Sequence, residues 1–495
     1  MNTGDQTMQI REHQQIQWDD DLAHAEAAIP IIGRLYRERG VVVSLFGRPL
    51  LGQSPIGILK AHRYSRHIDE EPPSITETLS VLTALDWVNT PGVSVDIGQL
   101  LRQHRTSPVE ETIADRLRRE LAALSEAASN PSEPRDVVLY GFGRIGRMLA
   151  RILVERAGGA SALTLRAIVV KRRGENDLAK RASLLRRDSI HGPFEGSITI
   201  DTVNNTILAN GTLIQVIYSD APDEVDYTAY GLNDAIIVDN TGKWRDEAGL
   251  SRHLAARGAS RVLLTAPGKG ALPNIVHGVN DDLIADQPII TAASCTTNAI
   301  VPVLKVIEDA YGISNGHVET VHSFTNDQNL VDNFHPAERR GRAAGLNMVI
   351  TETGAAKAAE KALPNLAGKL SGSAVRVPTP NVSLAILSLT LDQPVTAEDV
   401  NALLRSVSLE GPLRRQIDYI ESPEVVSTDF LGSRRAGIVD GLATIATGGT
   451  NIVLYVWYDN ESGYSRQVHR VLTAMAGQHE VRLPGAAARI LEAAQ

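Results

Sequence analysis

The chain has 495 residues, which is long enough for several domains with substantial hydrophobic cores. Its formal net charge of −9 gives no electrostatic case for a nucleic-acid or anionic-membrane partner, and neither is expected. Met1–Gln15 is too polar for a signal peptide, and no apolar run approaches the roughly 18 residues of a membrane span. Cys295 is the only cysteine, so no disulfide can form within one chain, and a cytoplasmic location is expected.

Residues 1–134 are predicted to form a mainly helical extension without a catalytic signature. Ser54-Pro55 and the Ser74/Glu77 capping box each predict a helix start, and Ser107-Pro108-Val109-Glu110 predicts another. Val41–Phe46 is either a short strand or a buried connection. The extension is interpreted as a docking or oligomerisation module, and the sequence does not identify its partner.

A nucleotide-binding pattern begins after a linker at Asn130–Pro134. Arg135–Tyr140 reads as a strand and Arg147–Arg156 as a helix, and a G-x-G-x-x-G motif lies between them. The first glycine permits a tight turn, the second lets the backbone approach a pyrophosphate, and the third lets helix pack on strand. The motif residues are Gly141, Phe142, Gly143, Arg144, Ile145 and Gly146.

The second predicted strand, Leu163–Val170, lacks the acid that usually follows it and binds the adenosine ribose. Lys171, Arg172 and Arg173 follow instead, and these cations could meet a 2′-phosphate. The alternative is a solvated basic turn. The missing acid argues against strict NAD preference.

Further strands alternate with helical segments, as in a doubly wound parallel sheet. Ala235–Asp239 leads into Thr241-Gly242, and Arg261–Thr265 leads into Ala266-Pro267. The predicted fold is therefore α/β, with a Rossmann domain followed by an α+β catalytic domain that contains an antiparallel sheet.

Cys295 is predicted to be a nucleophile. It lies between a buried strand, Pro288–Ala292, and a helical stretch, Ala299–Tyr311, so it should precede a helix N-terminus, where a thiolate is favoured. A lone cysteine is more often a small buried hydrophobe. The polar collar around it argues against that alternative, and its members are Ser294, Thr296, Thr297 and Asn298.

His322 follows the predicted strand Val318–Val321 and is the candidate general base, although a lone histidine on a strand is more often structural. Ala374–Val382 and Leu384–Leu391 suggest antiparallel strands. Gln467–Ala476 is predicted to be a closing helix that returns to the nucleotide domain.

Four motifs occur in the order found in phosphorylating glyceraldehyde-3-phosphate dehydrogenases, and the chain resembles a long bacterial form of that family. They are Gly141–Arg147, Asp188-Ser189-Ile190-His191-Gly192, Ser294–Asn298 and Trp457–Tyr464. The resemblance spans about Asp136 to about Ala476. It implies domains at residues 135–294 (NAD(P)-binding), 295–460 (catalytic) and 461–480 (C-terminal helix), between the extension at 1–134 and a tail at 481–495.

The resemblance implies oxidation of glyceraldehyde 3-phosphate to 1,3-bisphosphoglycerate through a cysteine thioester, in glycolysis or gluconeogenesis, with NAD or NADP, no metal and a homotetramer. The catalytic residues would be Cys295 and His322. The substrate and phosphate ligands would be Ser294, Thr296, Thr325, Asp327, Arg340, Thr353, Gly354 and Arg376. The cofactor ligands would be the six residues of the glycine motif with Lys171, Arg172, Thr241, Gly242, Thr265, Asn460 and Tyr464, where Asn460 binds the nicotinamide carboxamide.

Two positions depart from the commonest family pattern: Ile350 replaces a proline and Tyr140 replaces an asparagine. Two alternatives stay open. An erythrose-4-phosphate dehydrogenase would release its thioester with water, although Arg340 and Thr353-Gly354 favour phosphate. A regulatory or interaction protein would keep the fold without turnover, although Cys295 and His322 argue against that reading.

Overall fold

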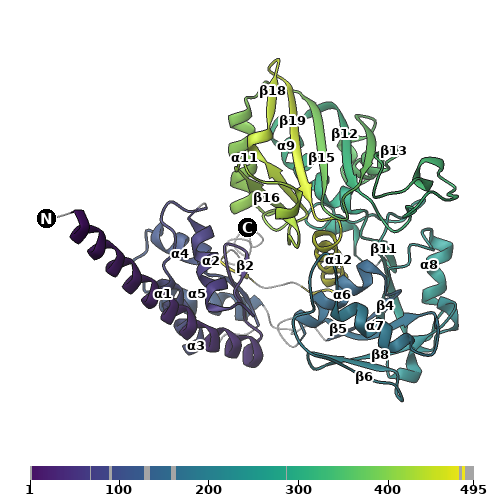
Figure 1. Cartoon of the computed structure of the whole chain (residues 1–495), viewed down its shortest axis with the longest axis horizontal. Helices are drawn as coiled ribbons and strands as arrows, with labels where there is room; N and C mark the ends of the chain where they lie inside the picture. Colours follow the sequence, from purple (N-terminus) through teal and green to yellow (C-terminus); the bar gives the residue numbers. More distant parts are fainter. Residues whose placement is uncertain are drawn as a thin grey trace. The chain divides into compact units, whose positions relative to one another are not determined.

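The computed structural model describes residues 3–66, 68–88, 92–127, 134–157, 163–285, 287–478 and 482–484, and omits the side chains of 3–12 and 123–127. Asn130–Glu133 of the expected linker lie outside this range. The chain divides into two compact units (Figure 1). Unit 1 runs up to Pro134 and resumes at Gln478, whereas unit 2 contains Arg135–Ala157 and Leu163–Gly477.

Unit 1 surrounds a small sheet with helices. The helices are α1 (Thr3–Arg39), α2 (Pro55–Ser65), α3 (Ile75–Trp87), α4 (Ile97–Arg105) and α5 (Ile113–Ala127). The sheet order is β2 (Arg48–Pro49), β1 (Val42–Leu45), β3 (Ser94–Asp96) and β20 (Arg482–Leu483). One core joins sheet and helices, with Leu35, Val43, Leu82, Val95 and Leu483 buried in it.

The expected helix starts at Ser54 and Ser74 are confirmed, because both side chains cap their helices and Ser74/Glu77 forms a full capping box. The capping box predicted at 107–110 is wrong. Helix α5 begins at Ile113, and Thr112 and Asp115 make the capping hydrogen bonds there. Within the segment predicted as a tail, 481–495, the described residues Arg482–Leu483 form a strand that pairs in parallel with β3.

The predicted nucleotide-binding domain of unit 2 is built on a largely parallel sheet. Its strand order is β11 (Ile289–Thr291), β10 (Ala259–Leu264), β9 (Ala235–Asp239), β4 (Arg135–Tyr140), β5 (Leu163–Val170), β8 (Thr212–Tyr218), β7 (Thr206–Ala209) and β6 (Ile198–Asp201), with only β6 and β7 antiparallel to their neighbours. The helices are α6 (Arg144–Glu155), α7 (Asp177–Arg186) and α8 (Glu247–Leu254). The expected doubly wound topology is confirmed.

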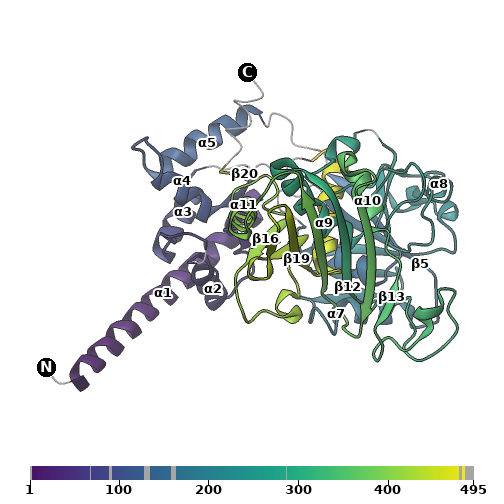
Figure 2. The same cartoon turned by 90° about the horizontal axis from the view of Figure 1, so that it is seen from above.

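The predicted catalytic domain has a mixed sheet in the order β13 (Val349–Thr351), β14 (Leu370–Val377), β12 (Ile313–Ser323), β15 (Ser383–Leu391), β19 (Asn451–Tyr458), β17 (Gly437–Asp440) and β16 (Ile417–Ile420), and β18 (Ile445–Thr447) pairs with β19. Helices α9 (Cys295–Tyr311), α10 (Ala355–Ala362) and α11 (Ala397–Leu409) share its core. Helices α9 and α10 contact β12 (Figure 2). The strands predicted at 374–382 and 384–391 do not pair with each other, because both flank β12.

Helix α12 (Ser462–Met475) connects the two domains of unit 2. It leaves the end of β19, and Val468, Val471 and Leu472 on its buried face join the core of the nucleotide-binding sheet. The predicted closing helix therefore begins five residues earlier than expected and packs where expected. Its first turn follows Asp459 and Asn460, so the packing of α12 fixes both residues between the domains.

Candidate active site

A tight turn between β11 and α9 presents Cys295. Ser294 is the N-cap of α9, and its hydroxyl accepts a hydrogen bond from the Thr297 N–H at 3.0 Å. Ala293 has a φ of +52°, a conformation that side-chain-bearing residues seldom adopt outside functional turns. The buried Tyr464 hydroxyl donates to the Ala293 carbonyl at 3.0 Å and so supports this turn.

Cys295 and His322 face each other across the site. The Cys295 Sγ lies 3.6 Å from the His322 Nε2. The other ring nitrogen, Nδ1, lies 2.7 Å from the Ser323 carbonyl oxygen and 3.0 Å from the Arg376 Nη1. Because a carbonyl oxygen can only accept, the shorter contact assigns the Nδ1 proton to the bond with Ser323. This tautomer leaves an unprotonated Nε2 facing the sulfur, so the imidazole can accept the thiol proton.

Burial shifts the pKa of both reacting groups toward their neutral forms. Burial raises the pKa of the Cys295 thiol, and the opposing effects of Arg376 and of hydrogen bonds from Thr296 are smaller. Burial and the Arg376 charge lower the pKa of His322 to about 3. The expected resting thiolate at the start of α9 is therefore not favoured, because desolvation outweighs the helix terminus. Cys295 keeps partial solvent access, which moderates this upward shift.

Arg376 and Arg340 place two positive charges near the histidine. The parallel pairing of β12 with β14 places Arg376 directly opposite His322. The Arg376 Nη1 donates to the Ser323 carbonyl at 3.0 Å and to the Thr325 hydroxyl at 3.3 Å. Asp327 accepts from Thr325 and forms an ion pair with Arg340. Hydrogen bonds and one ion pair thus link four of the expected phosphate ligands: Thr325, Asp327, Arg340 and Arg376.

Three of the remaining expected phosphate ligands lie at the starts of the neighbouring helices α9 and α10: Thr296, Thr353 and Gly354. Thr353 and Gly354 follow β13 and lead into α10, whose N-cap Gly354 has no side-chain cap. A Cβ built on Gly354 would meet no atom within 4 Å, so the start of α10 is open to a ligand. The Thr296 hydroxyl is instead buried against the Tyr458 hydroxyl at 2.9 Å, which places it under the site.

The glycine motif forms a cradle that fits the pyrophosphate of a dinucleotide. Gly141 has a φ of +92°, and a Cβ on Gly146 would lie 2.5 Å from the Gly141 carbonyl oxygen. Gly143 faces open space and caps α6 without a side-chain hydrogen bond, so the N–H groups at the start of α6 remain available. Bound there, NAD(P) would supply the hydride acceptor.

The other expected cofactor residues lie in the core, in an ion pair or at the turns after β9 and β10. The side chain of Phe142 packs into the core with Ile145 beside it, and Arg144 forms an ion pair with Glu461. Thr241, Gly242 and Thr265 follow β9 and β10 at the carboxyl edge of the sheet, next to the glycine motif. A Cβ on Gly141 would meet the Thr241 methyl group at 2.8 Å, which confirms how closely these turns approach.

The basic turn after β5 has an acidic neighbour that sequence reasoning missed. The Lys171 Nζ lies 3.2 Å from a carboxylate oxygen of Asp220, which is 82 % exposed and follows the adjacent strand β8. The Arg172 guanidinium stacks over the Tyr218 ring at 3.9 Å. Neighbouring strands in this sheet are distant in sequence, so only the fold brings Asp220 to the turn.

Asn460 is held in one orientation at the end of β19. Its Oδ1 accepts hydrogen bonds from the Ser323 hydroxyl at 2.9 Å and the Ser383 hydroxyl at 3.2 Å. Its Nδ2 makes no hydrogen bond with a described residue, so it remains available as a donor. Sequence reasoning missed Ser383, as well as Tyr458, whose ring packs edge-on against the His322 ring.

In the part of the chain that the structure describes, no group of three or more His, Cys, Asp or Glu side chains is arranged so that it could hold a metal ion. None of the described helices has the length and apolar character needed to cross a bilayer.

The chain matches known proteins over both domains of unit 2. Residues 135–247 match "Glyceraldehyde 3-phosphate dehydrogenase, NAD binding domain", and residues 294–460 match "Glyceraldehyde 3-phosphate dehydrogenase, C-terminal domain". Glyceraldehyde-3-phosphate dehydrogenase 1 of Bacillus subtilis (strain 168) is 41 % identical over 334 residues, 67 % of this chain and 95 % of the relative. A chloroplastic relative of Arabidopsis thaliana, glyceraldehyde-3-phosphate dehydrogenase GAPA1, is also 41 % identical over 334 residues, 67 % of this chain and 81 % of the relative.

A glyceraldehyde-3-phosphate dehydrogenase-like protein of Pseudomonas aeruginosa (strain UCBPP-PA14) is 58 % identical over 460 residues, which is 92 % of this chain and all of the relative. An alignment of that length includes much of unit 1, so that relative shares the extension. The matched domains, the Cys295–His322 pair and the glycine cradle agree with one another, and the chain belongs to the glyceraldehyde-3-phosphate dehydrogenase family of NAD(P)-dependent oxidoreductases.

Proposed function

We propose that the protein is a phosphorylating dehydrogenase that converts glyceraldehyde 3-phosphate, inorganic phosphate and NAD(P) to 1,3-bisphosphoglycerate. The observation that carries this proposal is the 3.6 Å approach of the Cys295 Sγ to an unprotonated His322 Nε2, beside Arg376. The site thus combines a nucleophile, a base and an anion-binding group, which is what acyl transfer from a phosphorylated aldehyde requires.

The first step is attack of the Cys295 sulfur on the aldehyde carbon. The Nε2 of His322 accepts the thiol proton as the carbon–sulfur bond forms, and the product is the alkoxide of a thiohemiacetal on Cys295, beside the protonated imidazole. An anion bound between Arg376 and Arg340 would offset the charges that lower the pKa of His322. Substrate binding therefore makes the imidazole a stronger base when the proton is to be transferred.

Loss of a hydride from this alkoxide would leave a thioester on Cys295, with bound NAD(P) as the hydride acceptor. The Cys295 N–H at the start of α9 and the protonated His322 stabilise the oxygen while it carries negative charge. Asn460, whose Oδ1 is held by Ser323 and Ser383, would offer its Nδ2 as the donor that holds the nicotinamide carboxamide. Inorganic phosphate at Ser294, Arg340, Thr353 and Gly354 then attacks the thioester carbon, and the cysteine sulfur leaves to give the acyl phosphate.

We further propose a homotetramer as the working assembly. The segment between β12 and the end of β13 exposes large hydrophobic side chains, each at least 64 % exposed: Leu330, Val331, Phe334, Leu346, Met348 and Ile350. We name these six side chains the apolar segment. Such a concentration of exposed apolar groups is typical of an interface, and a second copy of the chain is the proposed occupant.

The function is tested by initial rates with glyceraldehyde 3-phosphate or erythrose 4-phosphate, NAD or NADP, and with or without inorganic phosphate. Turnover of glyceraldehyde 3-phosphate should require phosphate and yield an acyl phosphate. A rate that is independent of phosphate, with a carboxylate product, would instead favour the erythrose-4-phosphate reaction with water. Absence of turnover under all conditions would favour a regulatory protein.

The catalytic residues are tested in the same assay. Cys295→Ser should abolish turnover, and iodoacetamide should inactivate the wild type with labelling at this single thiol. His322→Asn should slow acylation by about 10²–10⁴-fold, the usual contribution of a general base. His317→Asn is the matched control, because His317 lies on the same strand and bonds Ser371 and Ser373 away from the sulfur. An unchanged rate in His322→Asn would contradict the mechanism.

A further inference from the structure

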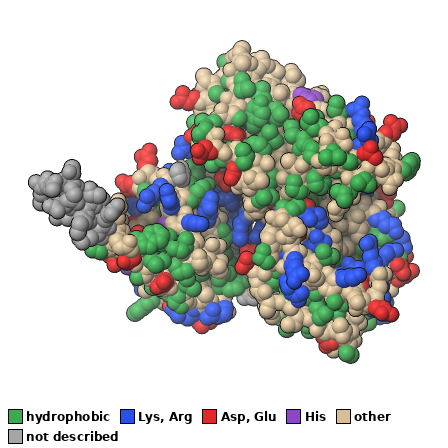
Figure 3. Space-filling view, in the orientation of Figure 1, with side chains coloured by type: hydrophobic (Ala, Val, Ile, Leu, Met, Phe, Trp, Pro, Cys, Tyr) green, Lys and Arg blue, Asp and Glu red, His purple; other side chains and the backbone are tan. Residues whose placement is uncertain are grey.

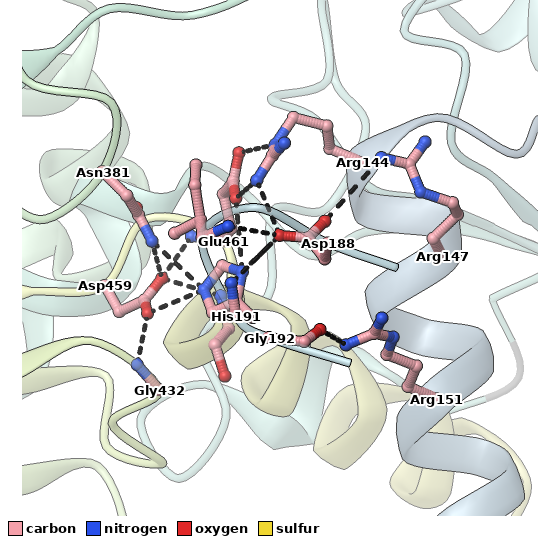
Figure 4. A network of polar contacts seen from close by, with 12 residues as sticks. Arg144, Arg147, Arg151, Asp188, His191, Gly192, Asn381, Gly432, Asp459 and Glu461 are labelled. Atoms are coloured by element: carbon pink, nitrogen blue, oxygen red, sulfur yellow. Dashed lines mark hydrogen bonds and ion pairs between the residues drawn. The ribbon is translucent and has the colours of Figure 1, made fainter. Parts of the chain in front are cut away.

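The Asp188–Gly192 motif meets the end of β19 in a buried network of charges (Figure 4). His191 lies at the centre of this network, and its side chain is 6 % exposed. Its Nε2 lies 3.0 Å from the Asp459 Oδ2 and 3.1 Å from the Asn381 Nδ2, and its Nδ1 lies 3.6 Å from the Asp188 Oδ1 and 3.7 Å from the Glu461 Oε2. Three carboxylates therefore surround one imidazole, and the reaction described above does not use it.

Asp459 shapes the turn that carries Asn460. Its Oδ1 accepts hydrogen bonds from the N–H groups of Glu461 and Ser462, at 2.9 and 2.8 Å, and from the Asn381 Nδ2 at 2.9 Å. Its Oδ2 accepts from the Gly432 N–H at 2.8 Å and faces His191. This fully buried carboxylate thus fixes the backbone on both sides of Asn460, and His191 is its only partner from the nucleotide-binding domain among the described residues.

The carboxylates nearest His191 favour its protonated form. Those of Asp188, Asp459 and Glu461 lie within 3.0–3.7 Å of its ring nitrogens. The guanidinium groups of Arg144, Arg147 and Arg151 on α6 interact with these carboxylates from the other side. Although burial opposes the charged form, the bond to Asp459 and the nearby carboxylates raise the pKa of His191 above its ordinary value.

We propose that His191 is a positioning residue for Asn460: in its protonated form it ties the Asp188–Gly192 loop to the Asp459–Ser462 turn and so sets the Asn460 amide for the cofactor. Arg151 holds the loop from the other side, since its guanidinium donates to the Gly192 carbonyl at 3.0 Å. The inference depends on the proposed function because it assigns the nicotinamide carboxamide to Asn460.

The expected pH dependence follows from the sign of the shift. Because the folded-state pKa of His191 is raised, the imidazolium contacts are complete below the ordinary histidine value of about 6.5 and are lost as pH rises through the raised pKa. Cofactor affinity should therefore be constant at acid pH and decrease on the alkaline side. By linkage, binding of NAD or NADP should raise the pKa of His191 further.

The first test compares equilibrium binding of NAD and NADP to the full-length enzyme between pH 6 and pH 9. His191→Gln keeps a hydrogen-bond donor but no charge, so its Kd should be about tenfold higher than that of the wild type at pH 6 and lose the alkaline dependence. His277→Gln is the matched control, since His277 is also paired with a carboxylate, that of Asp281, outside the network. A His191→Gln pH profile that superimposes on that of the wild type overturns the proposal.

The second test needs no variant at His191. Exchange of the histidine C2 proton, followed by mass spectrometry, measures the pKa of each histidine in the wild-type enzyme. An increase at His191 on adding NAD or NADP is expected, and an unchanged value overturns the proposal. Asn460→Ala distinguishes a failure of the positioning role of His191 from a failure of the nicotinamide assignment of Asn460. If Asn460→Ala weakens binding and His191→Gln does not, only the positioning role fails, whereas no effect of Asn460→Ala removes the nicotinamide assignment itself.

Discussion

Lys171, Arg172 and Asp220 form the group of side chains on which cofactor choice should depend. The carboxylate of Asp220 neutralises part of the Lys171 charge, and Tyr218 holds the Arg172 guanidinium beside it. A 2′-phosphate at this turn would replace Asp220 as the partner of Lys171. A charge-assisted contact contributes about 1.5–3 kcal/mol when buried and less at an exposed turn such as this one.

We therefore expect NADP to be used at least as well as NAD. Lys171→Asp should decrease the ratio of kcat/KM for NADP to that for NAD by about tenfold or more, and Asp220→Asn should increase it, because Lys171 then lacks a competing acid. Lys305→Asp, on the outer face of α9, is the control for net charge. A wild-type enzyme a hundredfold better with NAD would show that this turn does not contact the ribose.

The sequence predicted the site residues whose chemistry is signalled locally, such as Cys295 before a helix and the glycines between strand and helix. It did not reveal the residues that hold them, because their partners are distant in sequence. Ser383 and Ser323 fix Asn460 from two other strands, and His191 reaches Asp459 across 268 positions. No local pattern assigns Ser323, Ser383 or His191 this role, although His191 lies in one of the four motifs of the family resemblance.

At the scale of elements, the helices and strands of unit 1 were also predictable only where neighbouring residues determine them. Helix starts marked by Ser54 and Ser74 were predictable because capping depends on neighbouring residues. Ser107 carried the same signal, yet Thr112 caps the helix instead, so several polar residues in one stretch leave the start ambiguous. Strand β20 has two residues and pairs with a strand almost four hundred residues earlier, which no periodicity could indicate.

Strand β20 should stabilise unit 1 through Leu483, which is buried in the core of that unit. Leu483→Ala should cost about 2–5 kcal/mol of unit 1 stability, the usual range for a buried leucine. Hydrogen exchange measured at the amides of β3 should accelerate accordingly, while kcat remains unchanged. Val109→Ala, at an exposed position of unit 1, is the control. Unaltered protection of β3 would mean that β20 is dispensable.

At the scale of the whole molecule, the apolar segment is the strongest indication of self-association. The viewed face of unit 2 also carries hydrophobic side chains over its upper part, which belongs to the catalytic domain (Figure 3). Burying several large apolar side chains between copies would contribute about 1.5–3 kcal/mol for each fully buried residue. The proposed tetramer thus has a driving force in the described surface.

The assembly is tested by sedimentation velocity. Phe334→Glu and Leu346→Glu each place a charge in the apolar segment, and the double variant should sediment as a smaller species than the wild type. Val203→Glu is the control, because Val203 is equally exposed on the turn between β6 and β7. Identical sedimentation of the double variant and the wild type would exclude the apolar segment as the interface.

The position of β20 also determines the order in which the protein is completed on the ribosome. Unit 2 lies between α5 and β20 in the chain, so all of it must be synthesised before β3 gains its last neighbour. At 5–20 residues per second, the interval is roughly 20 to 70 s. Throughout that time β3 offers an unpaired edge, a feature that favours strand addition by other chains. Unit 1 thus emerges first but completes its sheet last. A ribosome that stalls within unit 2 leaves an open sheet edge, by which chaperones and proteases can recognise the unfinished chain.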